Sequence, residues 1–255
     1  MSFQRNVWKV RTFAVSIGYR EYTTIPNLPG NSPKPNESSP YAVSPGVTSM
    51  TPLLLRSLPL EIPVFDGPED RNGRRNNDEI RFWADYVTPG RSGYIYDDQG
   101  VQGGLKPGEL FVIAGDQNSD PLDGDSIPGS IQQLLDNPLV NTKVTPTSLG
   151  GPWASRVQGN LNVLHRSNPL FDTADFCDTP AFPPCSGPGN LRADYVLPRK
   201  NLQITGAGVV WPSLDPADAD PLAPFAYLVD PNGFGFPAPT SDHRAVWVDV
   251  TVPAN

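Results

Sequence analysis

The stretch FVIAGDQNSDPLDGD, residues 111–125, joins an apolar run directly to a concentration of acidic side chains. The run FVIAG has the length and the β-branched and aromatic content of a buried strand, and it ends at a glycine. Four aspartates and one asparagine then follow within ten positions. A turn after a strand needs only one Asp or Asn beside a Gly. The excess of carboxylates therefore predicts a functional site at the end of this strand.

The composition of the whole chain favours a β-rich domain with long ordered loops. The chain has 255 residues, enough for one large domain or two small ones, and 31 of them are prolines. This is more than twice the average proline usage of roughly 5%. Because proline fixes φ and lacks a backbone donor, a helix-rich fold is disfavoured.

The formal net charge of −8 limits the classes of partner. Broad, sequence-independent binding of nucleic acid normally needs a basic surface, because Lys and Arg make the phosphate contacts. A small phosphorylated substrate remains compatible with this charge if a divalent cation supplies the positive charge. No stretch reaches the ~18 apolar residues of a membrane span, and the N-terminus does not have the pattern of a signal peptide.

Residues 1–62 differ in pattern from residues 63–255. Most of the first segment is rich in Pro, Ser, Asn and Thr and has neither helical nor strand periodicity, which predicts an irregular or non-homologous extension. Its last part, LLLRSLPLEIPVF at 53–65, is expected to form at most a short or edge strand, because of its prolines. We expect the folded domain to occupy residues 63–255.

Two helices are expected in the patterned part. NNDEIRFWADYV at 76–87 places four apolar side chains on one helical face, and Asn76 or Asn77 is the expected N-cap. SIQQLLDNP at 130–138 predicts a short helix in which Ser130 and Gln133 form a capping box. Residues 140–190 are expected to be mostly irregular.

Further strands are expected in RADYVLP, NLQITGAGVVWP and HRAVWVDVTV, at 192–198, 201–212 and 243–252. Each is a short β-branched or aromatic run bounded by Gly, Pro or Asp. Strands and helices alternate loosely, which predicts an α/β (α+β) domain with mixed sheets.

Polar side chains that could take part in catalysis or binding lie at three of these strand ends. Asp116 and Asn118 follow the first strand, Asp194 begins the second, and Asp242 and His243 precede the last. We expect them to converge on one edge of the sheet structure, where loops position functional groups on a rigid scaffold. A histidine oriented by a carboxylate is the usual arrangement for a general base or a phosphate-contacting imidazolium.

Each of these residues also has a purely structural interpretation. Asp116 could close an Asx-turn, Asp194 could be a charge at a strand edge, and His243 could be an exposed or structural histidine. The two cysteines, Cys177 and Cys185, lie in a proline-rich loop and could form a disulfide or remain two free thiols. Without neighbouring histidines they do not indicate a zinc site.

Three motifs carry a resemblance to a known family. GDQNSDP resembles the GDxN motif of the endonuclease/exonuclease/phosphatase superfamily, RADYVLP resembles its (I/L/V)DY strand, and SDHRAV resembles its terminal SDH motif. The motifs occur in the family's order. The chain looks most like the pancreatic-type deoxyribonucleases, and the segments PVFDGPEDRNGRRNNDEIRFWADY and GDSIPGSIQQLL resemble a bacterial, typically secreted branch.

The resemblance implies a four-layered αββα sandwich and metal-dependent hydrolysis of phosphoesters, in a small molecule or in nucleic acid. By motif, Asp116 would help to activate water and Asn118 would contact the scissile phosphate. Asp194 would hold His243, which would contact or protonate the phosphoryl group, and Asp242 would bind Mg²⁺, with Mn²⁺ and Ca²⁺ as alternatives. The secreted branch implies an extracellular or periplasmic location.

The resemblance covers about residues 62 to 252, and parts of the family pattern are missing. The family begins with a strand ending in Asn and a segment ending in a metal-binding Glu, and neither is found in residues 1–62. The stretch LLLRSLPLEIPVFDG lacks the histidine that the family often has there. We therefore expect the domain to be incomplete at its N-terminus, through a truncated or frame-shifted reading frame; the other explanation is that a partner or an unusual N-terminus supplies the missing groups. The alternative to an enzyme is a catalytically silent fragment or binding module.

Overall fold

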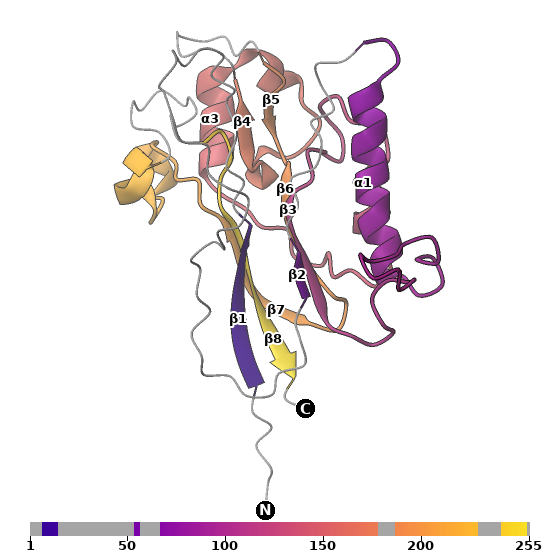
Figure 1. Cartoon of the computed structure of the whole chain (residues 1–255). Coiled ribbons are helices and arrows are strands. Elements are labelled where there is room, and N and C mark those ends of the chain that lie inside the picture. The colour runs from indigo at the N-terminus through magenta and orange to yellow at the C-terminus, as the bar shows by residue number, and fades with distance from the viewer. Residues whose placement is uncertain (1–6, 15–53, 57–66, 178–186, 229–240, 254–255) are drawn as a thin grey trace, which may run out of the picture.

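The computed structural model describes residues 7–14, 54–56, 67–177, 187–228 and 241–253, the first two ranges as backbone only. Two three-stranded sheets form its centre, and helices lie beside and beyond them (Figure 1). The remaining residues lie outside this description.

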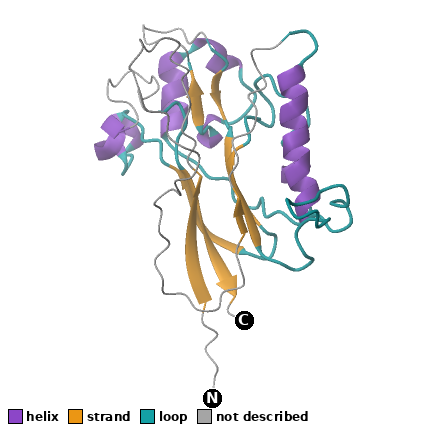
Figure 2. Ribbon diagram, in the orientation of Figure 1, coloured by secondary structure: helices purple, strands orange, loops and turns teal. Residues whose placement is uncertain are grey.

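One sheet has the strand order β2-β3-β6, and in it β2 runs parallel and β6 antiparallel to β3. The second sheet is antiparallel with the order β1-β8-β7, and a two-stranded sheet pairs β4 with β5 (Figure 2). The strands are β1 (Val7–Ala14), β2 (Leu54–Arg56), β3 (Phe111–Asp116), β4 (Ala174–Phe176), β5 (Gly189–Leu191), β6 (Asp194–Pro198), β7 (Gln203–Val209) and β8 (Val246–Pro253).

Strand β3 is buried on both faces, as its continuous apolar sequence predicts. Side chains alternate between the faces of a strand. Val112 and Ala114 therefore belong to one hydrophobic cluster, while Phe111 and Ile113 belong to another. The first cluster includes the valines of β8, so we call it the inter-sheet core.

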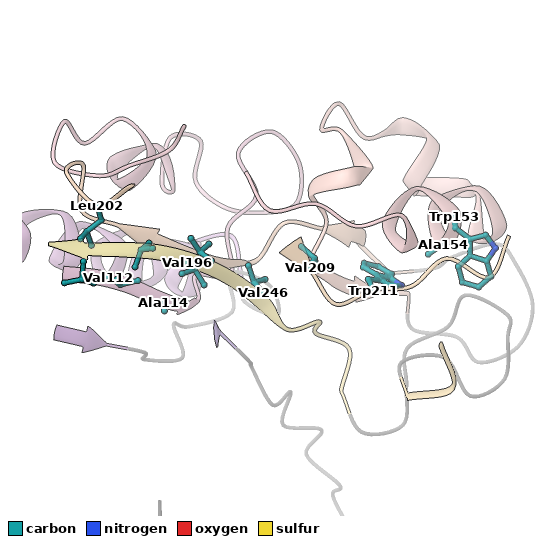
Figure 3. Packing of buried hydrophobic residues seen from close by; sticks show 12 residues of the cluster. Val112, Ala114, Trp153, Ala154, Val196, Leu202, Val209, Trp211 and Val246 are labelled. Carbon is teal, nitrogen blue, oxygen red and sulfur yellow. The ribbon is translucent and has the colours of Figure 1, made fainter. Parts of the chain in front are cut away.

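The inter-sheet core includes the even-numbered residues of β8, which are Val246, Val248, Val250 and Val252. In Figure 3 it continues past the strands toward Trp211 and Trp153. Burial of the valines explains why the pattern AVWVDVTV forms a strand with one face inward. At about 25 cal/mol per Å² of apolar surface, such contacts are the main stabilisation of the two-sheet arrangement.

Helix α1 (Arg71–Val87) covers the other face of the sheet that contains β3. The predicted apolar face is confirmed, because it packs in one cluster with Phe111 and Ile113; its residues are Ile80, Trp83, Ala84 and Val87. The predicted start was wrong, since the helix begins at Arg71. Asn76 is buried inside the helix instead of capping it, and its Nδ2 donates to the carbonyl of Gln117 at 2.9 Å.

The short helix α2 (Gln132–Leu135) is present, but the predicted capping box is not formed. Ser130 Oγ lies 3.0 Å from Asn77 Oδ1, and Gln133 Nε2 donates to the same oxygen at 3.0 Å. Both side chains therefore join α2 to α1, and this tertiary contact replaces the local cap.

Residues 140–190 are more regular than the sequence predicts. They include α3 (Gly150–Gln158), the 3₁₀ helices η1 (Asn160–Leu164) and η2 (Pro169–Phe171), and the strands β4 and β5. Gly150 and Gly151 begin α3, and glycine weakens a helix signal. Gly150 is required by packing, because a Cβ there would collide with Trp211. Two more 3₁₀ helices, η3 (Pro216–Asp218) and η4 (Ala223–Leu228), lie between β7 and β8.

The N-terminal segment is not irregular throughout. β1 pairs with β8 from Val7↔Pro253 to Ala14↔Val246, and β2 pairs with β3 as a short edge strand. Backbone pairing with two strongly patterned strands overrides the weak local signal. The mixed helix and strand content agrees with the α/β class, while the four-layered sandwich and the boundary at residue 62 stay predictions. Within the described ranges, no helix has the length and apolarity to span a membrane.

Candidate active site

Asp116 and Asp194 are brought together by the pairing of β3 with β6. They are directly opposite one another at the end of the antiparallel ladder. Both have even numbers, so both lie on the face that carries Val112, Ala114 and Val196 in the inter-sheet core. The alternation of the two strands thus places two carboxylates at one end of the space between the sheets.

His243 reaches the same place from the segment that precedes β8. An isolated antiparallel bridge joins His243 to Ala174, the first residue of β4. On either side of this bridge, the N–H of Asp175 donates to the carbonyl of Asp242 at 2.8 Å, and the N–H of Arg244 donates to the carbonyl of Thr173 at 2.7 Å. Backbone hydrogen bonds therefore fix the segment that carries Asp242 and His243.

The imidazole of His243 lies between three carboxylates. Its Nδ1 is 2.8 Å from Asp194 Oδ2, and its Nε2 is 3.8 Å from Asp116 Oδ2 and 4.0 Å from Asp242 Oδ1. The His243 and Asp116 side chains are nearly buried and that of Asp194 is fully buried, whereas the Asp242 side chain is 34% exposed. The Phe176 ring packs against the imidazole in a T-shaped arrangement, with ring centroids 5.3 Å apart. The predicted convergence of Asp116, Asp242 and His243 is confirmed.

Asn118 lies beside this group in a turn. Its backbone has a positive φ of 46°, and its N–H donates to Asp116 Oδ1 at 2.7 Å. The Asx-turn interpretation of Asp116 is thus correct for one carboxylate oxygen, while the other faces His243. The neighbouring N–H of Gln117 donates to the carbonyl of Ala193 at 2.8 Å, which ties the turn to β6. The role of the Asn118 side chain stays a prediction.

The clustering of acids shifts the pKa values of the two central groups. Burial, followed by the charge of Asp194, raises the pKa of Asp116 to about 7. Burial opposes protonation of His243, but the hydrogen bond and charge of Asp194, with the charges of Asp116 and Asp242, raise its pKa to about 9. At neutral pH, His243 is therefore an imidazolium held between carboxylates.

The residues present fit a divalent cation. Ligand atoms of Asp116, Asp194 and His243 lie within 4.8 Å of one another. Asp242, the most exposed of the three carboxylates around His243, offers a further oxygen ligand beside this group. Three carboxylates face one imidazolium here, and oxygen ligands of this kind suit a hard cation, which would offset their excess negative charge.

Three supporting residues were not found by sequence reasoning. Thr173 Oγ1 donates to Asp194 Oδ2 at 3.1 Å. Arg244 is 2% exposed, lies over the ring of Trp211 at 4.6 Å, and donates from Nη1 to the carbonyls of Ser241 and His243 at 3.2 Å each. Asp175 Oδ2 is 3.9 Å from Arg244 Nη2. None of the three has a sequence pattern that separates it from an ordinary loop residue.

The other aspartates of the opening stretch shape the loop. Asp120 accepts hydrogen bonds from the N–H groups of Leu122, Asp123 and Arg192. Asp123 accepts from the N–H groups of Arg166 and Ser167, so it joins this loop to the one after η1. Asp125 is exposed.

The structure also decides between a disulfide and two free thiols for the cysteines. Cys177, which directly follows β4, is disulfide-bonded, and the only other cysteine in the sequence is Cys185. The bridge is adjacent to the strand that holds the Asp242–His243 segment.

Comparison with known proteins gives one match. A sequence model described as "Endonuclease/Exonuclease/phosphatase family" matches residues 7–243. This range includes all of the site residues and most of residues 1–62. No curated protein and no solved structure matches the chain.

Proposed function

Because the chain belongs to the endonuclease/exonuclease/phosphatase family, we propose that it hydrolyses phosphoesters with the help of a divalent cation. The observation that carries the proposal is the contact of His243 with Asp194 on one ring nitrogen and its proximity to Asp116 and Asp242 on the other. Family membership indicates a metal-dependent phosphoesterase, and the geometry supports the roles that we propose for this chain's own residues.

We assign cation binding to Asp242, and we propose Mg²⁺, with Mn²⁺ and Ca²⁺ as alternatives. The ion would offset charge on the phosphoryl group and lower the pKa of bound water. Asp242 suits this role because its carboxylate is partly exposed and accessible to an ion with several water ligands.

His243 would stabilise negative charge on the phosphoryl group. Its Nδ1 is occupied by Asp194, so only Nε2 is directed toward the space shared by Asp116 and Asp242. With a pKa of about 9, the ring carries its proton at neutral pH and donates a strong, charge-assisted hydrogen bond. The same proton is available to the leaving group.

Asp116 would accept a proton from the attacking water. Its pKa of about 7 lies near neutral pH, where a general base works most effectively. Asn118, held in the turn directly after it, would contact the scissile phosphate through its side-chain amide.

The substrate class is proposed from charge. The net charge of −8 favours a small phosphoester or a short nucleic-acid segment over extended duplex DNA. The disulfide at Cys177 supports an extracellular or periplasmic location, because such bonds persist in oxidising compartments.

A catalytically silent binding module is the second candidate. Among the described residues, the group of possible metal ligands contains no glutamate. The sequence of residues 1–62 also has no segment that matches the family's strand-terminal Asn or its metal-binding Glu. Both observations favour a scaffold that has lost part of its catalytic set.

The two candidates are separated by assays of the full chain. Hydrolysis of phosphomonoesters, phosphodiesters and single- and double-stranded DNA and RNA would be measured with Mg²⁺, Mn²⁺ or Ca²⁺ and with EDTA. Asp116→Asn should reduce EDTA-sensitive turnover by about 10²–10⁴-fold. The matched control, Asp125→Asn, removes an exposed carboxylate of the same loop and should have little effect. Absence of EDTA-sensitive turnover on every ester would favour the binding module.

A further inference from the structure

We propose that Thr173 is a positioning residue that fixes the carboxylate of Asp194 and, through it, the ring of His243. The catalytic part of this inference rests on the proposed function, whereas the structural part does not. Thr173 directly precedes β4 and is 1% exposed. It touches neither the expected cation site nor His243 by any described side-chain contact, so its effect must pass through Asp194.

The hydroxyl of Thr173 has no freedom of direction. Thr173 Oγ1 accepts hydrogen bonds from the N–H groups of Ala193 at 3.0 Å and Asp194 at 2.8 Å. A hydroxyl has two acceptor lone pairs and one proton. Because both lone pairs are used, the proton must point to its remaining neighbour, Asp194 Oδ2, at 3.1 Å.

This direction determines what Asp194 Oδ2 does. An oxygen that accepts from Thr173 Oγ1 is an acceptor toward His243 Nδ1 as well, at 2.8 Å. Nδ1 must therefore carry a proton and donate it to Asp194. The opposite nitrogen, Nε2, is then the atom that faces Asp116 and Asp242.

Asp194 depends strongly on this single hydroxyl. Its side chain is fully buried, and its second oxygen, Oδ1, has no hydrogen-bond partner in the part of the chain that the structure describes. Thr173 and His243 thus provide the described side-chain hydrogen bonds to this carboxylate. A buried carboxylate that loses one of two donors is more costly to keep charged and less fixed in direction.

The backbone of Thr173 fixes where the hydroxyl stands. Its N–H donates to the carbonyl of Leu191 at 2.9 Å, and its carbonyl accepts from Arg244 N–H at 2.7 Å. One residue is therefore bonded both to the segment that leads to Asp194 and to the segment that carries His243. This placement explains how two distant parts of the chain keep a 2.8 Å contact.

The test uses variants of the full chain and two independent measurements. Thr173→Val is nearly isosteric and removes the hydroxyl, while Thr173→Ser retains it. The first measurement is an NMR spectrum of protein labelled with ¹⁵N-histidine. Because the sequence has only two histidines, His165 and His243, the strongly hydrogen-bonded Nδ1–H of His243 is readily assigned. The second measurement is kcat/KM for a phosphoester with the activating cation.

We expect a far-downfield Nδ1–H signal of His243 in the wild type, retained in Thr173→Ser and moved upfield or lost by exchange in Thr173→Val. Because Thr173→Val removes a hydrogen bond to a charged group, we expect it to lower kcat/KM by about 10- to 100-fold relative to the wild type. The kcat/KM of Thr173→Ser should stay within about threefold of the wild-type value. If Thr173→Val does not fold, Thr173→Ala removes the same hydroxyl with less steric demand and should give the same result.

A wild-type spectrum without this signal would overturn the proposal, as would a folded Thr173→Val or Thr173→Ala variant with an unchanged signal. Equal losses in the Ser and Val variants would also overturn it, because they would indicate that the site responds to any change of packing at this position and not to loss of the hydroxyl. If the wild type hydrolyses no phosphoester, the proposed function fails, but the histidine spectrum still decides the role of Thr173.

Discussion

Asp194→Asn is expected to lower the pKa of His243 from about 9 to about its ordinary value of 6.5 or below. The substitution keeps the shape of the side chain but removes its charge at the 2.8 Å contact with Nδ1. Burial of the ring, which opposes protonation, remains. Asp116 and Asp242 remain as well, but they are farther away, at 3.8 and 4.0 Å from Nε2.

The magnitude follows from the two pKa values. A pKa difference of one corresponds to about 1.4 kcal/mol, so the change from 9 to 6.5 corresponds to roughly 3 kcal/mol of interaction with the charged ring. Because the folded-state pKa is raised, this stabilisation is fully present below about pH 6.5 and is lost as the pH rises through about 9. The wild type should therefore exceed Asp194→Asn in unfolding free energy at about pH 6, and this difference should shrink by about pH 9.5.

The assay is an NMR titration of the two imidazole signals in EDTA-treated protein, with urea unfolding at both pH values. EDTA removes any cation that would compete with the proton. The signal of His165, whose Nε2 lies 2.9 Å from the carbonyl of Pro188, should not change on substitution of Asp194 and serves as the internal control. Titration of His243 near 6.5 in the wild type would refute the reasoning, as would an unchanged pKa in Asp194→Asn.

Two further predictions concern stability. Asp172 is buried with an unpartnered Oδ1, and burial, followed by the charge of Asp120, raises its pKa to about 9. The folded state thus holds a proton that the unfolded state releases, so Asp172→Asn should raise the thermal midpoint at about pH 8 but not at about pH 4; equal shifts would contradict this. Gly150→Ala should cost about 1–3 kcal/mol in urea unfolding because of its collision with Trp211. Gly93→Ala, where a Cβ has open space, should cost much less, and equal costs would show that the collision is relieved by small movements.

The central strands and the site could be predicted because both rest on short-range patterns. Alternation of apolar residues defines β8, and a continuous apolar run defines β3. Asp116, Asp194 and His243 were identifiable because each lies directly at the end of such a run. Their convergence follows once the register pairs Asp116 with Asp194.

The remainder could not be predicted because tertiary contacts decide it. Asn76 has the sequence signature of a cap, but its amide is used by the carbonyl of Gln117 far along the chain. Packing against Trp211 requires a glycine at position 150, and this glycine weakens the helix signal of α3 in the sequence. Thr173 acts through a hydrogen bond to Asp194, and Arg244 lies beside Asp175; both partners are distant in sequence, and no local pattern of a single chain reveals them.

The two sheets contribute different parts of the site, since Asp116 and Asp194 belong to β3 and β6 while His243 precedes β8. The distance between the sheets is set by the side chains of the inter-sheet core, among them Val196 and Val248. Functional groups must be held to within roughly 0.5 Å of their working positions. An engineer who repacks this core for greater thermal stability will therefore also be altering the geometry of the candidate site. Libraries that vary these valines need to be screened for turnover as well as for melting temperature.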